Sequence, residues 1–430
     1  MNQPLKIAIA GLGTVGARTL RILSDHSAML WERCGRRLEV SAVSARNRGK
    51  DRGISIDTFA WFDDPVEMAK SADADVLVEL IGGEDGVAKA VSETAIENRR
   101  HVVTANKALL AHHGTALAKA AEATNVTLAY EAAVAGGIPI VKSLREGLAA
   151  NNLTCVYGIL NGTCNYILTA MRESGRPFDE VLREAQELGY AEADPSFDID
   201  GIDAAHKIAI LTSIAFGTEI NFEAVHVEGI RQVSPLDIAY AEELGYRIKL
   251  LATARRTANG IEQRVHASMV PNTASIAFVD GVTNAVVAEG DAIGSAVLVG
   301  PGAGAGPTAS AVVADLIDIA RGRVTPTFSV PATSLKPLTP AAMEQHRGSY
   351  YIRLMVDDKP GVVADVAAAL RDEQVSLESM LQRARSPEMA VPVVLTTHTT
   401  EEADIRRALQ RIGALNSVRE APCMIRIEDF

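Results

Sequence analysis

The chain has 430 residues, of which 47% are hydrophobic, 22% charged and only 4% aromatic, and its formal net charge is −12. This length suits two or three domains, and the balance of apolar and charged residues is that of a globular protein with an aliphatic core. The acidic net charge argues against nucleic acid and anionic membranes as partners, and no apolar run reaches the 18 residues of a membrane span.

Strands and helices alternate over the first part of the chain. The apolar patterns predict strands at 5–10, 38–44, 75–81, 101–104 and 127–131, with helices from the first glycine-rich turn to about 30, at 87–98 and at 114–124. Such alternation is typical of a parallel, doubly wound sheet with helices on both faces. We therefore predict an α/β, Rossmann-type domain over residues 1–134.

In the middle of the chain, predicted strands and helices no longer alternate regularly. Helices are predicted at 138–150, 164–174, 178–188 and 202–216, and strands at 153–160, 225–232, 248–256, 261–270 and 282–289. A second glycine-rich run, at 300–310, opens a helix that ends near 321. These patterns predict a second, α+β domain over 135–328, whose helix at 308–321 packs back on the first domain.

The last part of the chain begins with a linker. Residues 329–348 hold three prolines and show little periodicity. The following residues, 349–430, read strand (350–356), helix (361–371), strand (375–383), strand (390–399), helix (403–412) and strand (417–427). This βαββαβ order predicts a ferredoxin-like unit. Because the unit has its own apolar strands, a chain cut near Ala341 is expected to fold and to remain active.

Gly11, Gly13 and Gly16 form a G-x-G-x-x-G turn between the first strand and the first helix. The first glycine makes the tight turn, the second admits a pyrophosphate, and the third lets the helix pack on the strand. Thr14 and Val15, inside the same turn, open the helix whose N–H groups would meet the phosphates. The turn predicts a dinucleotide site.

The end of the second strand carries no acidic residue to bind a ribose hydroxyl. It reads Ser-Ala-Arg-Asn-Arg at 44–48, with Lys50 beyond. Arg46 could meet a 2′-phosphate, so NADP(H) is favoured, with NAD(H) possible. The alternative is that Arg46 and Arg48 belong to a solvated loop.

Asp203 and Lys207 lie four residues apart on an apolar helix and therefore share one face. A buried lysine with a shifted pKa suits proton transfer, whereas the competing interpretation is a structural salt bridge. An acidic loop with Glu192, Asp194, Asp198 and Asp200 precedes this helix and would suit a substrate ammonium group. By spacing alone, an acidic loop that only caps the helix is an equal alternative. Lys107 follows the fourth strand, at the sheet edge where ligands bind.

Several motifs in series carry a family resemblance. GLGTVG (11–16), TANK (104–107), YEAAVAGGIP (130–139), NGTCNYIL (161–168), GYAEADP (189–195), DGIDAAHK (200–207) and GPGAGAGPTAS (300–310) resemble homoserine dehydrogenase over about 5–325. Cys164 stands where threonine is more usual. With no kinase-like segment before the glycine-rich turn, the chain resembles the monofunctional form.

The resemblance implies an activity, an NAD(P)-binding role for the domain at 1–134, a catalytic and dimerisation role for the domain at 135–328, and roles for single residues. The activity is NAD(P)H-dependent, reversible reduction of L-aspartate 4-semialdehyde to L-homoserine, in threonine, methionine and isoleucine biosynthesis. Lys207 would be the general acid and base. Glu192, Asp203 and Asp198 would bind substrate, and Lys107, Gly189 and Gly302 would contact the cofactor. Backbone carbonyls around Glu131, Val134, Gly136 and Ile138 would hold a monovalent cation, Na⁺.

The C-terminal unit resembles the ACT regulatory domain. The D-x-P-G-V turn at Asp358–Val362 would expose backbone to an amino-acid effector, for which L-threonine, an end product, is the first candidate. The alternative is a dimerisation module without ligand. The resemblance also implies a homodimer or homotetramer.

Two competing functions remain open at this stage. An aspartate-semialdehyde dehydrogenase-like enzyme needs a cysteine nucleophile, for which Cys164 is the candidate. A non-catalytic amino-acid-sensing protein would retain the nucleotide fold without turnover. The four cysteines form no C-x-x-C pair and the first strand begins near residue 5, which favours a cytoplasmic protein without a signal peptide.

Overall fold

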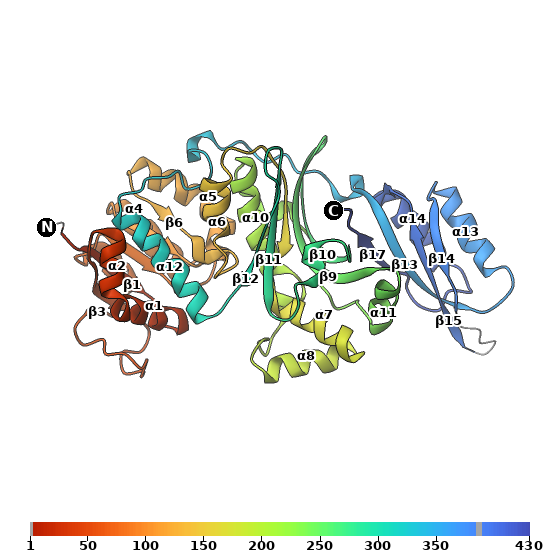
Figure 1. The fold of residues 1–430 in the computed structure, drawn as a ribbon, viewed down its shortest axis with the longest axis horizontal. Coiled ribbons are helices and arrows are strands. Elements are labelled where there is room, and N and C mark those ends of the chain that lie inside the picture. The colour runs from red at the N-terminus through yellow and green to blue at the C-terminus, as the bar shows by residue number, and fades with distance from the viewer. Residues whose placement is uncertain (1–2, 384–388) are drawn as a thin grey trace.

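The computed structural model describes residues 3–383 and 389–430, which form three units arranged in a row (Figure 1). The N-terminal unit lies at one end, the β-rich middle unit follows, and the C-terminal unit lies at the other end. Across these described ranges, no helix combines the length and apolarity that crossing a bilayer requires. The α/β fold class predicted from the sequence is confirmed.

The N-terminal unit is a six-stranded parallel sheet in the order β3-β2-β1-β4-β5-β6. Successive strands are added on one side of β1 as far as β3 and on its other side from β4 onward, and this switch opens a crevice at the carboxyl ends of β1 and β4. β1 and β4 are buried almost throughout, as central parallel strands must be when helices cover both faces. The strands are β1 (Leu5–Ala10), β2 (Leu38–Ser44), β3 (Ala60–Phe62), β4 (Val76–Glu79), β5 (His101–Thr104) and β6 (Leu128–Ala129). The helices are α1 (Thr14–Asp25), α2 (Ser27–Cys34), α3 (Pro65–Ser71), α4 (Val87–Glu97) and α5 (Lys107–Ala123).

One helix from much later in the chain completes this first unit. α12 (Ala305–Ala320) lies along α1 and α2, and its buried Val312 and Leu316 belong to the same apolar cluster as Ile7 and Val78. The helix therefore fixes the position of the middle unit relative to the nucleotide turn.

The middle unit is built on antiparallel strands that helices cover. β9 and β10 form its longest pairing, with twelve residue pairs, and β7, β11 and β12 extend the sheet on the β9 side. The strands are β7 (Leu153–Ile159), β8 (His226–Val227), β9 (Tyr246–Thr257), β10 (Gly260–Pro271), β11 (Thr283–Gly290) and β12 (Gly294–Pro301). The helices are α6 (Ile140–Lys142), α7 (Gly162–Ser174), α8 (Phe178–Glu187), α9 (Ser196–Ile199), α10 (Ile202–Phe216) and α11 (Pro235–Glu243).

The C-terminal unit has the βαββαβ order, and its sheet is continuous with that of the middle unit. β17 lies between β10 and β13, pairing in parallel with Ser268 and Met269 of β10. One eleven-stranded sheet therefore spans both units. The elements of the unit are β13 (Arg347–Asp357), α13 (Val362–Asp372), β14 (Leu377–Leu381), β15 (Ala390–Thr397), β16 (Thr400–Glu401), α14 (Glu402–Gly413) and β17 (Cys423–Ile427).

The segment interpreted as a linker packs closely on the middle unit. Ala332 is fully buried, the backbone of Thr339 accepts from Ile261 N–H, and Lys336 bridges to Thr218. The proline content of this segment prevents long helices and strands, but it does not prevent docking, because prolines retain their carbonyl acceptors.

Several element boundaries differ from the sequence-based expectations. The first helix stops at Asp25 and a new one starts at Ser27, and α5 begins at Lys107 rather than at 114, because Asn106 caps it by accepting from Leu109 N–H. The strand predicted at 225–232 is reduced to His226–Val227. β12 was not predicted, because at the sheet edge none of its residues is buried and its apolar residues fall on both faces of the strand.

Candidate active site

The glycine-rich turn between β1 and α1 is built for close backbone approach. A Cβ on Gly11 (φ +101°) would lie 2.4 Å from the carbonyl oxygen of Leu80, and one on Gly16 would lie 2.1 Å from that of Gly11. Gly13, in contrast, faces open space, with no heavy atom within 4 Å of its Cβ position. Gly11 therefore allows the turn to pack on the end of β4, Gly16 allows α1 to pack on the turn, and Gly13 leaves room for a ligand beside the N–H groups of Thr14 and Val15.

A cavity of about 530 Å³ lies against this turn. Gly11 and Gly13 line one part of it, and Arg46 and Lys50 line the part beyond the end of β2. Arg48 turns away, with its guanidinium 5.8 Å from the ring centre of Trp61, whereas Arg52 ties the loop together through the carbonyls of Asn47, Lys50 and Leu12. Arg46 is thus the arginine of the 44–48 segment that faces the cavity.

A second cavity, of about 580 Å³, lies between the N-terminal and middle units. Eleven of the site residues predicted from the sequence line these two neighbouring cavities. Gly11, Gly13 and Arg46 line the first, and the second is lined by Val15, Lys107, Gly136, Asp198, Asp203 and Lys207. Gly189 (φ +75°) and Gly302 also line the second. A Cβ on Gly302 would lie 2.0 Å from Asn284 Nδ2, so no larger residue fits there.

Asp203 is the centre of the second cavity's polar groups. Its Oδ1 lies 2.8 Å from Lys107 Nζ, and its Oδ2 lies 2.7 Å from Lys207 Nζ. α5 supplies Lys107 from the N-terminal unit and α10 supplies Asp203 and Lys207, so one carboxylate joins ammonium groups from two units. Lys207 also donates to the carbonyl of Leu160, at 2.7 Å.

The two lysines differ in their electrostatic environment. Burial lowers the pKa of Lys207, and Asp203 offsets only part of this effect. Burial also lowers the pKa of Lys107, but the nearby carboxylates of Asp203, Asp198 and Glu192 together outweigh this effect and raise that pKa. Asp203 is itself buried, yet the two ammonium groups hold its pKa well below the ordinary range. Lys207 is therefore the lysine that releases a proton more readily, as a general acid requires.

The acidic loop contributes unequally to the cavity. Asp198 lines the cavity, and burial together with the nearby Asp203 raises its pKa. Glu192 is exposed on the loop between α8 and α9 and lies outside the cavity lining, although it is close enough to Lys107 to act on that lysine's charge.

Asn161 was not singled out by the sequence-based reasoning. Its Nδ2 donates to Asp198 Oδ1 (2.8 Å) and to Asp203 Oδ2 (2.9 Å), while its Oδ1 caps α7 by accepting from Cys164 N–H. An asparagine before Gly-Thr-Cys indicates a helix cap, and the cap uses only the Oδ1 atom of the side-chain amide. The Nδ2 atom of the same amide orients both carboxylates.

Cys164 does not have the properties of a nucleophile. It is fully buried, its Sγ lies 3.2 Å from the carbonyl of Asp198, and burial among carboxylates raises the pKa of its thiol well above the ordinary value. A catalytic cysteine needs an accessible thiolate. The aspartate-semialdehyde dehydrogenase alternative therefore loses its catalytic group.

The segment with Glu131, Val134, Gly136 and Ile138 forms a compact loop beside the cavity. Ala135 and Gly136 adopt left-handed conformations, with φ of +55° and +43°. The carboxylate of Glu131 accepts from the N–H groups of Val141 and Lys142, and burial near Asp315 raises its pKa to about 7. That carboxylate is thus committed to the backbone, which leaves carbonyl oxygens as the donors this loop offers to a cation.

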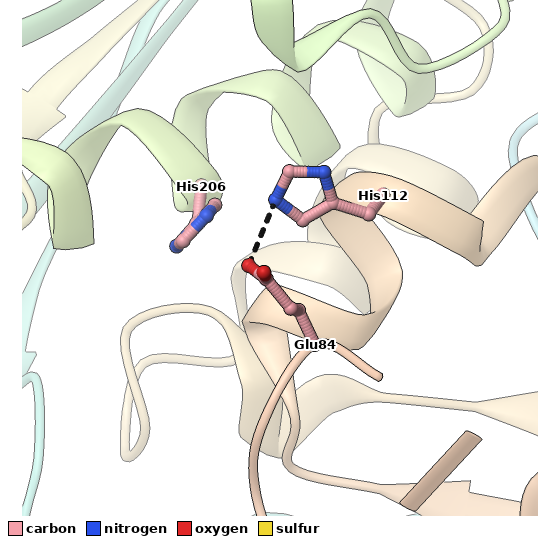
Figure 2. Close-up of side chains that lie close together, drawn as sticks. All are labelled: Glu84, His112 and His206. Atoms are coloured by element: carbon pink, nitrogen blue, oxygen red, sulfur yellow. Dashed lines mark ion pairs between the residues drawn. The ribbon is translucent and has the colours of Figure 1, made fainter. Parts of the chain in front are cut away.

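A separate group of side chains lies between α5 and α10, outside the lining of both cavities. Figure 2 shows Glu84, His112 and His206 pointing toward one another. His112 Nε2 lies 3.3 Å from Glu84 Oε2, and His206 is 2% exposed. Neither ring nitrogen of His206 has a hydrogen-bond partner within the described part of the chain.

Comparison with known proteins completes the description. Family models match residues 11–131 (homoserine dehydrogenase, NAD binding domain), 139–317 (homoserine dehydrogenase) and 350–416 (ACT domain). A homoserine dehydrogenase of Neisseria gonorrhoeae is 46% identical, with 100% of this chain and 99% of that protein covered. The crystal structure of a Thiobacillus denitrificans homoserine dehydrogenase superimposes with a TM-score of 0.93 at 45% identity, covering 100% and 99%. A hyperthermophilic archaeal homoserine dehydrogenase in complex with NADPH covers 76% of this chain and 100% of its own, with a TM-score of 0.66 at 28% identity.

Proposed function

The chain belongs to the homoserine dehydrogenase family and is an NAD(P)-dependent oxidoreductase acting on CH–OH, and we propose that its turnover depends on the pair of lysines that meets at Asp203. This convergence, in a cavity next to the nucleotide turn, is the observation that carries the proposal. The reaction is reversible reduction of L-aspartate 4-semialdehyde to L-homoserine, which serves threonine, methionine and isoleucine biosynthesis in the cytoplasm.

Lys207 is the general acid in the direction of reduction. A bound nicotinamide cofactor supplies the hydride for the aldehyde carbon. Negative charge then grows on the carbonyl oxygen, and an ammonium group within reach stabilises that charge and donates the proton. The carbonyl of Leu160 and the carboxylate of Asp203 hold Lys207 Nζ at a fixed position. In the oxidation direction the neutral amine accepts the proton.

The carboxylates around the cavity bind the substrate ammonium group. Asp198 lines the cavity and is oriented by Asn161, so it is ready to accept a cation. Glu192 lies on the loop before α9, and its carboxylate joins that of Asp198 when this loop packs on a bound substrate. Asp203 contributes its charge to the substrate site and holds Lys107 and Lys207 in place.

The residues around the nucleotide turn fit NADP(H) better than NAD(H). Arg46 faces the first cavity, and Lys50 lines it too, so a 2′-phosphate would meet cations at the end of β2. Gly11, Gly13, Thr14, Val15 and Gly16 would hold the pyrophosphate, with Lys107, Gly189 and Gly302 toward the nicotinamide. The NADPH complex of the archaeal relative supports this choice.

We also assign a sodium ion to the loop at Glu131, Val134, Gly136 and Ile138. The left-handed residues Ala135 and Gly136 bend the chain tightly, and hard oxygen donors suit Na⁺. Its role is structural, since the loop joins β6 to α6 and lies directly against Gly302, the carbonyl oxygen of which is 2.6 Å from a Cβ built on Gly136.

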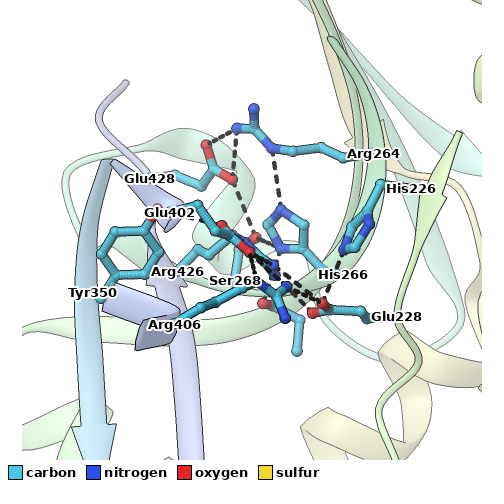
Figure 3. A network of polar contacts seen from close by, with 11 residues as sticks. His226, Glu228, Arg264, His266, Ser268, Tyr350, Glu402, Arg406, Arg426 and Glu428 are labelled. Atoms are coloured by element: carbon cyan, nitrogen blue, oxygen red, sulfur yellow. Dashed lines mark hydrogen bonds and ion pairs between the residues drawn. The ribbon is translucent and has the colours of Figure 1, made fainter. Parts of the chain in front are cut away.

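Regulation by threonine through the ACT domain is the third part of the proposal. The turn at Asp358–Val362 precedes α13, and Gly361, which has a φ of +98°, is exposed, so its backbone is accessible. Figure 3 shows how the unit connects to the middle unit: Arg264 of β10 binds Glu428, and Arg426 of β17 binds Glu228 and Glu402.

A second contact leads from the ACT domain toward the active site. Asp237, at the start of α11, accepts from Tyr351 and Arg353 of β13. α11 packs on α7, and the cap of α7 is Asn161, which orients Asp198 and Asp203. A shift of β13 on effector binding therefore has a contiguous packed route to the catalytic carboxylates.

A direct assay tests the proposed function. Full-length enzyme is given homoserine with NADP or NAD in parallel, with and without threonine, and formation of reduced nicotinamide is followed by absorbance. We expect turnover with both cofactors, a preference for NADP, and inhibition by threonine. Absence of hydride transfer would refute the function, while uninhibited turnover would refute only the regulation. Light scattering on the same sample tests the expected homodimer or homotetramer.

A further inference from the structure

From the group of side chains between α5 and α10 we infer a binding site for a divalent transition-metal ion of the zinc class, with Glu84, His112 and His206 as its ligands. The site is separate from the substrate cavity and does not depend on the proposed function. Each residue offers one ligand atom, and these atoms all lie within 4.8 Å of one another.

The unpartnered imidazole of His206 is the observation that points to a ligand. Buried polar groups almost always have hydrogen-bond partners, and an imidazole without one forfeits that stabilisation. His206 is 2% exposed and both of its nitrogens lack partners within the described residues. Its ring lies 5.5 Å from that of His112, and Figure 2 shows both rings and the Glu84 carboxylate turned toward one another.

The three side chains come from elements that the fold already holds together. α5 supplies His112, α10 supplies His206, and Glu84 lies on the loop after β4. Asn106, the cap of α5, donates to the carbonyl of Gly83 at 2.7 Å, so the loop is fastened beside the helix. Ligands of one tetrahedral ion lie about 3.3 Å apart, as bond lengths near 2.0–2.1 Å require. The His112–Glu84 pair, at 3.3 Å, already meets this spacing.

The chemistry of the donors selects the ion. Two imidazoles and one carboxylate suit Zn²⁺, Co²⁺ or Ni²⁺, whereas Mg²⁺ and Ca²⁺ prefer oxygen donors throughout. Phe222 lies against both rings, with centroids 4.5 Å from His206 and 4.9 Å from His112, and shields one side from water. Three protein ligands leave a fourth position for water.

A bound ion would connect two units of the enzyme. α5 begins with Lys107 in the N-terminal unit, and α10 carries Lys207 in the middle unit. An ion held by His112 and His206 joins these two helices, so it stabilises their relative position without contacting substrate. Ions that bind only the folded chain raise its melting temperature.

The test uses tag-free, full-length enzyme that has been stripped of metal with EDTA and dialysed. Co²⁺ is added and its visible d–d absorption recorded, and Zn²⁺ is titrated by calorimetry. We expect one site per chain, visible Co²⁺ bands and a rise in melting temperature with Zn²⁺. His112→Ala and Glu84→Gln should each weaken Zn²⁺ binding by about tenfold or more, since even outer-shell changes cost 10–100-fold.

His113→Ala is the matched control. It removes an imidazole from the same helix, but that imidazole pairs with Asp85 and not with Glu84. Both His112 and Glu84 are exposed, so their variants should fold as the parent does. Wild-type enzyme without Co²⁺ bands would overturn the site. So would equal Zn²⁺ affinity in the His112→Ala and His113→Ala variants.

Discussion

Lys207 combines burial, a lowered pKa and a fixed position within the cavity. If it is the general acid, Lys207→Ala should reduce turnover by ~10²–10⁴-fold, the usual contribution of a positioned acid or base. Because Lys207 does not line the nucleotide cavity, binding of NADPH, measured by fluorescence titration, should remain unchanged. A loss of less than about threefold, far below that range, would make the lysine a structural partner of Asp203 only.

Asp203 sets the pH range in which Lys207 can act. The carboxylate raises the pKa of Lys207, against the larger effect of burial, so Asp203→Asn should lower that pKa further. The ammonium form is present below the pKa and is lost as pH rises through it. The alkaline limb of kcat/KM for aldehyde reduction should therefore move to lower pH in Asp203→Asn.

The pH profile of Asp200→Asn provides the control for that shift. Asp200, the residue that follows α9, pairs with Arg231, whereas the charges that act most on the pKa of Lys207 are those of Asp203, Lys107 and Asp198. Identical alkaline limbs in the parent and Asp203→Asn would contradict the assignment.

Arg46 and Arg48 offer a matched pair for cofactor choice. Arg46→Asp places a negative charge in the nucleotide cavity and should reduce kcat/KM with NADP more than with NAD, by about tenfold or more, equivalent to one charge-assisted contact. Arg48→Asp should change the ratio much less, since Arg48 stacks on Trp61. Steady-state kinetics with both cofactors measure the ratio. If the ratio of kcat/KM with NADP to kcat/KM with NAD is the same in the parent and in Arg46→Asp, Arg46 does not determine the cofactor preference.

Side chains of the site differ in how far the sequence revealed them. Asp203 and Lys207 were predicted to share a face because helical spacing requires it. The placement of Lys107 on the same carboxylate depends on how α5 packs against α10, which no local pattern records. Asn161 was missed because its role as a helix cap concealed its second role between Asp198 and Asp203.

At the scale of the element, the β1–α1 turn separates stability from cofactor binding. Gly16→Ala would press a Cβ against the Gly11 carbonyl and should destabilise the fold by about 1–3 kcal/mol, as overpacking does.

Gly13→Ala meets open space at an ordinary φ of −74° and should change the free energy of unfolding by less than about 0.5 kcal/mol. Its affinity for NADPH should nevertheless fall, because the new methyl occupies the pyrophosphate face. Urea unfolding and NADPH titration of both variants distinguish the two effects, and an unchanged NADPH affinity in Gly13→Ala would place the pyrophosphate elsewhere.

Regular elements with strong periodicity were predicted well, and edges were not. The parallel strands β1, β2 and β5 have the predicted bounds, since central strands are continuous apolar runs. β12 lies at the edge of the large sheet, with Val297 and Val299 exposed, so its residues carried no clear pattern. The predicted helix at 138–150 is instead a short α6 followed by a π-helical turn, Ser143–Gly147.

At the scale of the whole molecule, the continuous sheet changes the expectation for a shortened chain. Cutting near Ala341 removes β17 from β10 and removes Glu428 from the buried Arg264. It also removes Tyr351 and Ile425, which belong to the largest apolar cluster of the molecule. We therefore expect the shortened chain to be destabilised by roughly 2 kcal/mol, which for a domain of about 150–250 residues lowers the melting temperature by about 4–8 °C. We also expect it to lose threonine inhibition.

Calorimetry of both chains, with threonine titrated in the activity assay, measures the two effects. A shortened chain that melts at the same temperature as the full chain would show that the interface contributes nothing to stability. Retained threonine inhibition would locate the effector site outside the ACT domain.

The position of β17 in the sheet also has a consequence for biosynthesis. β10 ends at Pro271, and its partner β17 ends at Ile427, so 156 residues separate the two along the chain. At 5–20 residues per second, a ribosome needs roughly 8–30 s to deliver β17 after β10 has emerged. During that interval Ser268 and Met269 present an unpaired strand edge, a surface that promotes aggregation. The nascent chain should therefore need protection by chaperones late in translation, after its nucleotide-binding part has already been synthesised.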